Sequence, residues 1–240
     1  MRWPWIALGL VLEVSSPARA ATPAELYERH CSLCHGPEGR GDGAAAARLP
    51  TPPADFSSGN FKLRSTPSGA LPTREDLLGT ITRGVPGTGM PSFAALPLED
   101  RRALVAEVET LSKPRDGGPS YFEARPSRRP IAVPARARAT PRIIAQGRKL
   151  YGDLSCPSCH GADGRGDGPS AAELKDYAGR PLHPTDFTLG VFKGGADPRQ
   201  LYLRIATGLN GTPMAEYGDD VMRPADRWAL VEYLLSLVGP

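Results

Sequence analysis

The chain has 240 residues, of which 40% are hydrophobic and 23% charged, a composition typical of a soluble globular protein with one large or two small domains. Its 27 glycines and 26 prolines favour compact domains with many loops over long helices or extended sheets. The formal net charge of +3 is too small and too scattered to favour nucleic acid as a partner.

The first predicted element is a secretory signal peptide over residues 1–20. Arg2 gives a positive start, "WPWIALGLVLEV" an apolar middle, and "ARA" a small-residue cleavage site near Ala20/Ala21. The alternative is a buried N-terminal helix. The apolar run is too short to span a bilayer, and no later stretch is a better candidate. We therefore expect a periplasmic protein without a transmembrane segment in its mature chain.

Residues 21–112 are predicted to form a first domain. It begins with a short helical segment, "PAELYERHC", and ends with an amphipathic helix, "LEDRRALVAEVETLS", whose apolar residues follow a three-to-four spacing. Between them lie the motif "CSLCHG", the glycine-rich stretch "GPEGRGDG" and a loop, "RGVPGTGMPSF", that contains Met90. The glycine-rich stretch lacks the full spacing of a calcium loop and does not link a strand to a helix, so it predicts tight turns.

Residues 113–141 are predicted to be a linker. They are rich in proline and arginine and lack helical or strand periodicity, which indicates an extended, semi-rigid segment. We expect its apolar side chains to hold it against a domain surface: Tyr121, Phe122, Ile131 and Val133. Its arginines are interpreted either as solvated or as a docking patch for an acidic partner.

Residues 142–240 are predicted to form a second domain that repeats the first. Cys31, Cys34 and His35 recur 125 residues later as Cys156, Cys159 and His160. "PADFSSGNFK" recurs as "PTDFTLGVFK", the methionine loop as "TGLNGTPMAEY", and the last helix as "PADRWALVEYLLSLV". So many features in the same order establish an internal duplication.

Each C-x-x-C-H motif predicts covalent attachment of haem c. On one helical turn, positions i, i+3 and i+4 share a face, so two thiols can bond the two vinyl groups of a porphyrin while the imidazole reaches the iron. A zinc site would need the cysteine pairs closer together in the chain. A thioredoxin-like pair would need a βαβ context, and a disulfide would leave both histidines unexplained.

The second axial ligand of each iron is predicted to be a methionine. Met90 and Met214 stand 55 and 54 residues after their histidines, in glycine-containing loops that can approach a ligand closely. Met222 and His183 are alternatives in the second unit without a counterpart in the first. His30 has Ser155 at its repeat position, which argues against a ligand role. Proline-rich segments after each motif are expected to offer a backbone carbonyl to the axial histidine.

Each unit resembles a class I cytochrome c domain over about residues 24–112 and 143–238, on the motifs "CSLCHG" and "CPSCHG", the methionine loops and the closing helices. The resemblance implies an all-α fold of two tandem domains, each with one covalent haem c and an exposed haem edge. It also implies that the final helix crosses the first. In "FKLRST", Lys62 and Arg64 are interpreted as partners of the haem propionates or as solvated surface.

These features predict a dihaem cytochrome that carries electrons between redox proteins, a respiratory donor and a terminal acceptor, and that is not an enzyme. With both axial positions filled, an iron exchanges single electrons with little rearrangement. One alternative is a dihaem peroxidase-like enzyme, in which one iron opens a coordination site for peroxide. Another is the cytochrome subunit of a larger respiratory oxidoreductase complex.

Overall fold

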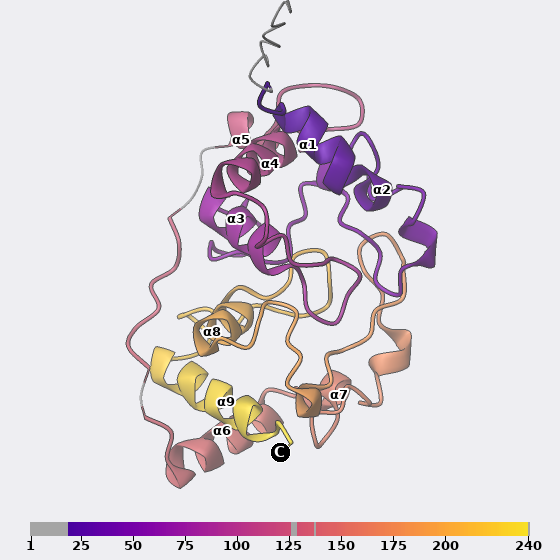
Figure 1. The fold of residues 1–240 in the computed structure, drawn as a ribbon. Helices are drawn as coiled ribbons and strands as arrows, with labels where there is room; N and C mark the ends of the chain where they lie inside the picture. The colour runs from indigo at the N-terminus through magenta and orange to yellow at the C-terminus, as the bar shows by residue number, and fades with distance from the viewer. Residues whose placement is uncertain (1–18, 126–128, 137, 240) are drawn as a thin grey trace, which may run out of the picture.

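The structure is a computed structural model that describes residues 19–125, 129–136 and 138–239, so the predicted signal peptide lies almost wholly outside the described residues. The described ranges form two helical units, one above the other in Figure 1. Their only β-type pairing is an isolated bridge between Lys175 and Pro181. The prediction of an all-α protein is confirmed.

Each unit contains four α-helices. Those of the first unit are α1 (Pro23–His30), α2 (Ser32–His35), α3 (Arg74–Arg83) and α4 (Leu98–Leu111). Those of the second are α6 (Pro141–Asp153), α7 (Pro157–His160), α8 (Pro198–Thr207) and α9 (Pro224–Ser236). Short 3₁₀ turns lie between them: η1 (Ala46–Arg48), η2 (Phe56–Ser58), η3 (Ala171–Glu173) and η4 (Phe187–Leu189). Within the described ranges, no helix combines the length and apolar character needed to cross a bilayer.

Side chains just before the helices determine where they begin. The hydroxyl of Thr22 accepts a hydrogen bond from the Glu25 amide, and the Glu25 carboxylate accepts one from the Thr22 amide. Thr73 and Asp76 form the same reciprocal pair at α3. Such capping satisfies amides that have no partner inside the helix, and each cap stabilises its helix by about 1 kcal/mol.

The first and last helices of each unit pack against each other, α1 on α4 and α6 on α9, as the resemblance implies. In the second unit the backbones approach closely at Gly147, where a Cβ atom would lie 2.0 Å from the Ala229 carbonyl oxygen. Around each helix pair lies a separate apolar core. Leu104 is fully buried in the first core, and Val231 is fully buried in the second.

The linker contains one helical turn, α5 (Tyr121–Ala124), so the expectation of a wholly extended segment was wrong. Ser120 caps this turn by accepting a hydrogen bond from the Phe122 amide. Tyr121 and Phe122 pack on the first core. Ile131 and Val133 pack on the second core, which confirms that the linker's apolar residues hold it to the domains.

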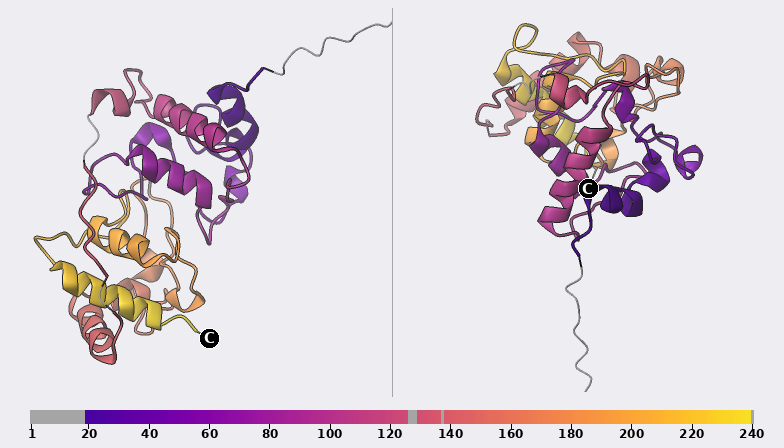
Figure 2. Two further views of the ribbon diagram at one scale, coloured as in Figure 1. Left: turned by 60° about the vertical axis from the view of Figure 1, so that its left-hand side comes forward. Right: turned by 90° about the horizontal axis from the view of Figure 1, so that it is seen from above.

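The two units meet directly, with α3 and α8 turned toward their junction (Figure 2). The Arg64 side chain is 1% exposed, and its Nη2 donates to the Thr207 carbonyl at 2.7 Å. Its other bonds go to the carbonyls of Pro67 and Phe61. Arg64 is therefore neither solvated surface nor part of the cavity described below; it joins the units.

Candidate functional site

The cysteine motifs form the matching one-turn helices α2 and α7, for which Cys31 and Cys156 are the N-cap residues. In the first unit the His35 amide donates to the Cys31 carbonyl at 2.9 Å, and in the second His160 donates to Cys156 at 2.9 Å. All four thiols are partly buried and none is in a disulfide. Burial raises the thiol pKa of both Cys31 and Cys156 to about 11.

A buried tyrosine fixes each turn from the preceding helix. The Tyr27 hydroxyl donates to the Gly36 carbonyl at 2.9 Å, and the Tyr151 hydroxyl donates to the Gly161 carbonyl at 2.7 Å. Both tyrosines have a raised pKa because burial disfavours the phenolate. The first helix of each unit thus determines where the thiols and the imidazole lie.

Each motif histidine is oriented by a backbone carbonyl. His35 Nδ1 lies 3.1 Å from the Ala54 carbonyl, and His160 Nδ1 lies 3.3 Å from that of Thr185. A carbonyl can only accept, so Nδ1 carries the proton and Nε2 keeps its lone pair for a metal. The carbonyls come from the expected segments, but each belongs to the residue after a proline, not to the proline itself.

Burial keeps these imidazoles in the neutral, metal-binding form. It lowers the pKa of His35 and of His160, although the carbonyl hydrogen bond partly opposes the shift. Each ring also stacks on a phenylalanine from the segment that supplies the carbonyl. The ring centroids are 4.9 Å apart for His35 and Phe56, and 4.5 Å apart for His160 and Phe187.

The predicted tight turns hold the carbonyl segments in place. The Gly41 amide donates to the His35 carbonyl at 2.8 Å, and the Phe56 amide donates to the Gly39 carbonyl at 2.8 Å. Gly41 has a φ of +72°, and a Cβ atom there would lie 2.8 Å from the Pro53 carbonyl oxygen. Only glycine permits both the positive φ and this close approach. The second unit repeats the arrangement with Gly164 and Gly166.

The two methionine loops have the same hydrogen bonds. The Met90 amide donates to the Thr88 hydroxyl and the Met214 amide donates to that of Thr212, both at 3.2 Å. Each methionine carbonyl accepts from an amide five residues earlier, at 3.1 Å. Met90 and Met214 both line the cavity described next, whereas Met222 is 5% exposed within the second core.

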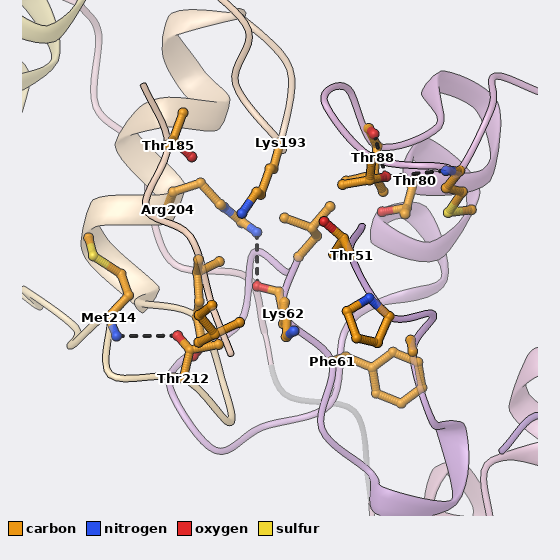
Figure 3. Close-up of a pocket in the computed structure, with 18 of the residues that line it drawn as sticks. Thr51, Phe61, Lys62, Thr80, Thr88, Thr185, Lys193, Arg204, Thr212 and Met214 are labelled. Atoms are coloured by element: carbon orange, nitrogen blue, oxygen red, sulfur yellow. Dashed lines mark hydrogen bonds between the residues drawn. The ribbon is translucent and has the colours of Figure 1, made fainter. Parts of the chain in front are cut away.

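One continuous cavity of about 460 Å³ is lined by both sets of predicted ligands. Figure 3 shows part of its wall, with Met214 of the second unit. Its wall is largely apolar and includes the cysteines, histidine and methionine predicted as ligands in each unit. His30 and His183 also reach it. Two thiols, a neutral imidazole and a thioether on an apolar wall are the donor set that a covalently attached haem requires, so the residues fit that group.

Sequence reasoning missed most of the cations at this cavity. Lys62 was considered, but Lys193, Arg204 and Arg180 also line the wall. Lys62 and Lys193 occupy equivalent positions in the repeated "FK" segments, and this repetition was the available signal. Nothing comparable marked Arg204, because the first unit has Thr80 at that position.

Family models match both units. The model described as "Cytochrome c" matches residues 144–238, and "Cytochrome C oxidase, cbb3-type, subunit III" matches residues 18–106. The chain also resembles a chain in the solved reducing HAO-like protein complex of Kuenenia stuttgartiensis. The two are 40% identical over 94% of this chain and 100% of that one, with a TM-score of 0.85. No curated protein matches the sequence.

The chain belongs to the class I cytochrome c family. It consists of two cytochrome c domains in tandem, which confirms the resemblance predicted from the motifs. Cytochrome c domains carry covalently bound haem c and transfer electrons, and these two properties apply to this cytochrome.

Proposed function

We propose that the cytochrome carries two haems, one in each unit. The thiols of Cys31 and Cys34 would hold the first, and those of Cys156 and Cys159 the second. His35 with Met90 and His160 with Met214 would be the axial ligands. The observation that carries this proposal is the duplicated donor set, which lines a single cavity with the same hydrogen bonds in both units.

The haem iron, when bound, supplies a one-electron couple. The chain's own residues hold each imidazole neutral, orient it through a carbonyl, and keep a thioether available in a hydrogen-bonded loop. A soft sulfur ligand favours the ferrous state, and filled axial positions exclude substrates. We therefore propose an electron carrier without enzymatic activity.

We further propose that the cytochrome works outside the cytoplasm, as one subunit of a larger redox complex. The sequence pattern of residues 1–20 supports export. The similar Kuenenia chain belongs to a complex, and the likeness extends over the whole of that chain, which supports an assembled rather than a free carrier here.

The decisive experiment is to express the protein in a host that attaches haem c and exports it. We expect a mass increase of two haems, a shorter chain that begins near Ala21, and a far-red ferric band with the strength of two methionine-ligated sites. One haem by mass would contradict the stoichiometry. Rapid binding of carbon monoxide or cyanide at either iron would contradict closed axial sites and favour a peroxidase-like enzyme.

Complex formation is tested separately by mild extraction from the native cells and size-exclusion chromatography. We expect the cytochrome to elute at a mass well above 25.6 kDa, together with a second redox protein. Elution as a monomer without a partner would favour a free carrier, with the electron-transfer proposal intact.

A further inference from the structure

Three cations lie at the junction of the two units, where the cavity passes from one unit to the other. Lys62 comes from the first unit, and Lys193 and Arg204 come from the second. Figure 3 shows the ends of Arg204 and Lys193 directed to the same part of the pocket, beside the backbone of Lys62. Arg204 also reaches across the junction, because its Nη1 donates to the Lys62 carbonyl at 3.2 Å.

None of these three cations forms an ion pair with a carboxylate of the described residues. Arg204 bonds only to the carbonyls of Lys62 and Arg64, and its Nε is buried without any partner. Arg180, on the same cavity wall, is paired with Asp176 at 2.7 Å. Among the lysines and arginines that line the cavity, only Lys62, Lys193 and Arg204 therefore lack a carboxylate partner in the described residues.

The three residues are half-buried, and removing their charges from water is costly unless an anion compensates them. Desolvation lowers the pKa of Lys62 and of Lys193, and lowers that of Arg204 to about 10, so the guanidinium stays charged at neutral pH. The carbonyl groups of Lys62 and Arg64 that accept hydrogen bonds from Arg204 are neutral, so they do not compensate its positive charge. The buried Nε still has a proton to donate. We interpret these features as a site for a carboxylate-like group from outside the polypeptide.

The haems that the proposed function places in this cavity carry such groups. Each haem has two carboxylate side chains at one porphyrin edge, opposite in chemistry to its apolar body. We propose that Lys62, Lys193 and Arg204 form a single carboxylate-binding seam shared by both haems, with Arg204 bridging the units. This inference rests on the proposed function, since it concerns the haems that the two donor sets hold.

The repeat explains why the seam is shared rather than duplicated. Lys62 and Lys193 occupy equivalent positions, so each unit contributes one ammonium. Arg204 has no such counterpart, because Thr80 stands at its repeat position and donates its hydroxyl to the Asp76 carbonyl within α3. The seam therefore contains a single guanidinium, which the second unit supplies.

A shared cation has a measurable electrostatic consequence. Reduction adds one negative charge to an iron, and a fixed positive charge nearby in a low-dielectric site favours that state. A cation between two haems thus raises both reduction potentials. Loss of the Arg204 charge should therefore lower both reduction potentials. It would also leave the carboxylates that Arg204 binds uncompensated, and their negative charge would lower the potentials further.

The test is a spectroelectrochemical titration of the holoprotein with Arg204→Gln, which removes the charge but keeps a hydrogen-bond donor. We expect both steps of the titration to move to lower potential. Arg204→Lys should recover most of the shift. Arg199→Gln removes an exposed charge from the same helix and should leave both steps unchanged.

Redox-difference infrared spectra supply a second readout. Carboxylate bands from haem labelled at its propionate carbons should move in Arg204→Gln and not in Arg199→Gln. A shift of only one titration step would overturn the sharing of the seam. Unchanged potentials and unchanged infrared bands would overturn the seam altogether.

Haem content by mass is measured first on each sample. A wild-type protein without two covalent haems contradicts the proposed function itself, whereas two haems with unmoved potentials contradict only this inference. If Arg204→Gln does not fold, Lys62→Gln and Lys193→Gln replace it. Within the described residues, the Lys193 ammonium makes one hydrogen bond, to the His183 carbonyl at 3.3 Å, and the Lys62 ammonium makes none. Each replacement should also lower both potentials.

Discussion

At the scale of single residues, chemistry at these sites depends on backbone groups as much as on the ligands. The motif histidines would be poor ligands if Nε2 carried the proton, and the carbonyls of Ala54 and Thr185 prevent this. Those carbonyls are fixed by turns in which glycine has a positive φ. The same histidine–carbonyl contact and glycine turn occur in both units, which indicates that they belong to the function of the site.

The two methionines of the second unit allow a direct comparison. We expect Met214→Ala to remove about half of the far-red ferric band and to lower the potential of one haem, because the thioether would no longer ligate iron. The fold should change little, since Met214 lies on a cavity wall. Absorption spectra and a redox titration provide the measurement.

Met222→Ala is the matched control. Its side chain is buried in the second core, so truncation should lower the free energy of unfolding by about 2–5 kcal/mol and keep the band at full strength. A band lost in Met222→Ala but kept in Met214→Ala would assign the axial position to Met222 instead.

Asp226 provides a pH-dependent contribution to stability. Hydrogen bonds from Arg223 lower its carboxyl pKa below the ordinary 3.8, and Gln146 adds a bond of 2.5 Å from α6 to α9. Because the folded pKa is depressed, this stability is fully present above about pH 4 and is lost as the pH falls through the folded value.

We therefore expect Asp226→Asn to cost about 1 kcal/mol in urea unfolding at pH 7, since Arg223 is largely exposed and its contribution is screened. The difference from wild type should shrink as the pH falls from 7 to 3. Asp153→Asn breaks an exposed pair with Lys149 and should cost less than about 0.5 kcal/mol at either pH. Equal costs for Asp226→Asn at pH 7 and pH 3 would contradict the assignment.

At the scale of helices, periodicity predicted the outer pair of each unit well. The closing helices were expected over 98–112 and 224–238, and the structure has them as Leu98–Leu111 and Pro224–Ser236. The middle helices α3 and α8 were not predicted from the sequence. The start of α3 was nevertheless marked by the capping pair of Thr73 and Asp76.

The close crossing of α6 and α9 gives a prediction at this scale. Alanine normally stabilises a helix by about 1 kcal/mol relative to glycine. At Gly147, however, its Cβ would meet the Ala229 carbonyl at 2.0 Å, so the helices must separate. We expect Gly147→Ala to lower the free energy of unfolding by about 1–3 kcal/mol or more, as measured by urea titration.

Gly152 in the same helix serves as the control. It is exposed, and nothing lies within 4 Å of the position a Cβ would take. Gly152→Ala should therefore be neutral or stabilising by up to about 1 kcal/mol. If both substitutions had the same effect, the helix crossing would not depend on the absence of a side chain at residue 147.

At the scale of the whole molecule, the duplication was readable from the sequence but the junction was not. Motif order and spacing repeat along the chain, whereas the bond from Arg64 to the Thr207 carbonyl joins groups 143 residues apart. No local pattern marks such a contact, because its acceptor is a backbone carbonyl that any residue could supply. The hydrogen-bond partner of buried Arg64 in the second unit could be identified only from the arrangement of the two units.

Arg64 allows the association of the units to be tested. Arg64→Met keeps a long apolar stem in the buried site but leaves the carbonyls of Phe61, Pro67 and Thr207 without that donor, at a cost of about 1–3 kcal/mol for each buried group left unpaired. Two of these carbonyls belong to the first unit. Calorimetry of the holoprotein should therefore change from one transition to two, with the first unit unfolding at the lower temperature.

Small-angle scattering should record a larger radius of gyration for Arg64→Met below the first transition, because the direct bond across the junction is lost. Arg142→Met, at an exposed position on α6, should match wild type in both measurements. A single, unshifted transition in Arg64→Met would mean that the remaining junction contacts suffice. The remaining contacts include the bonds from the Gly69 amide and the Ser68 hydroxyl to Asn210 Oδ1, at 3.1 and 3.5 Å, and the Arg204 bonds to the first unit. Combining Arg64→Met with Asn210→Ala, which also removes the acceptor of the Ser68 hydroxyl and the Gly69 amide, should then weaken the junction further and split the transition.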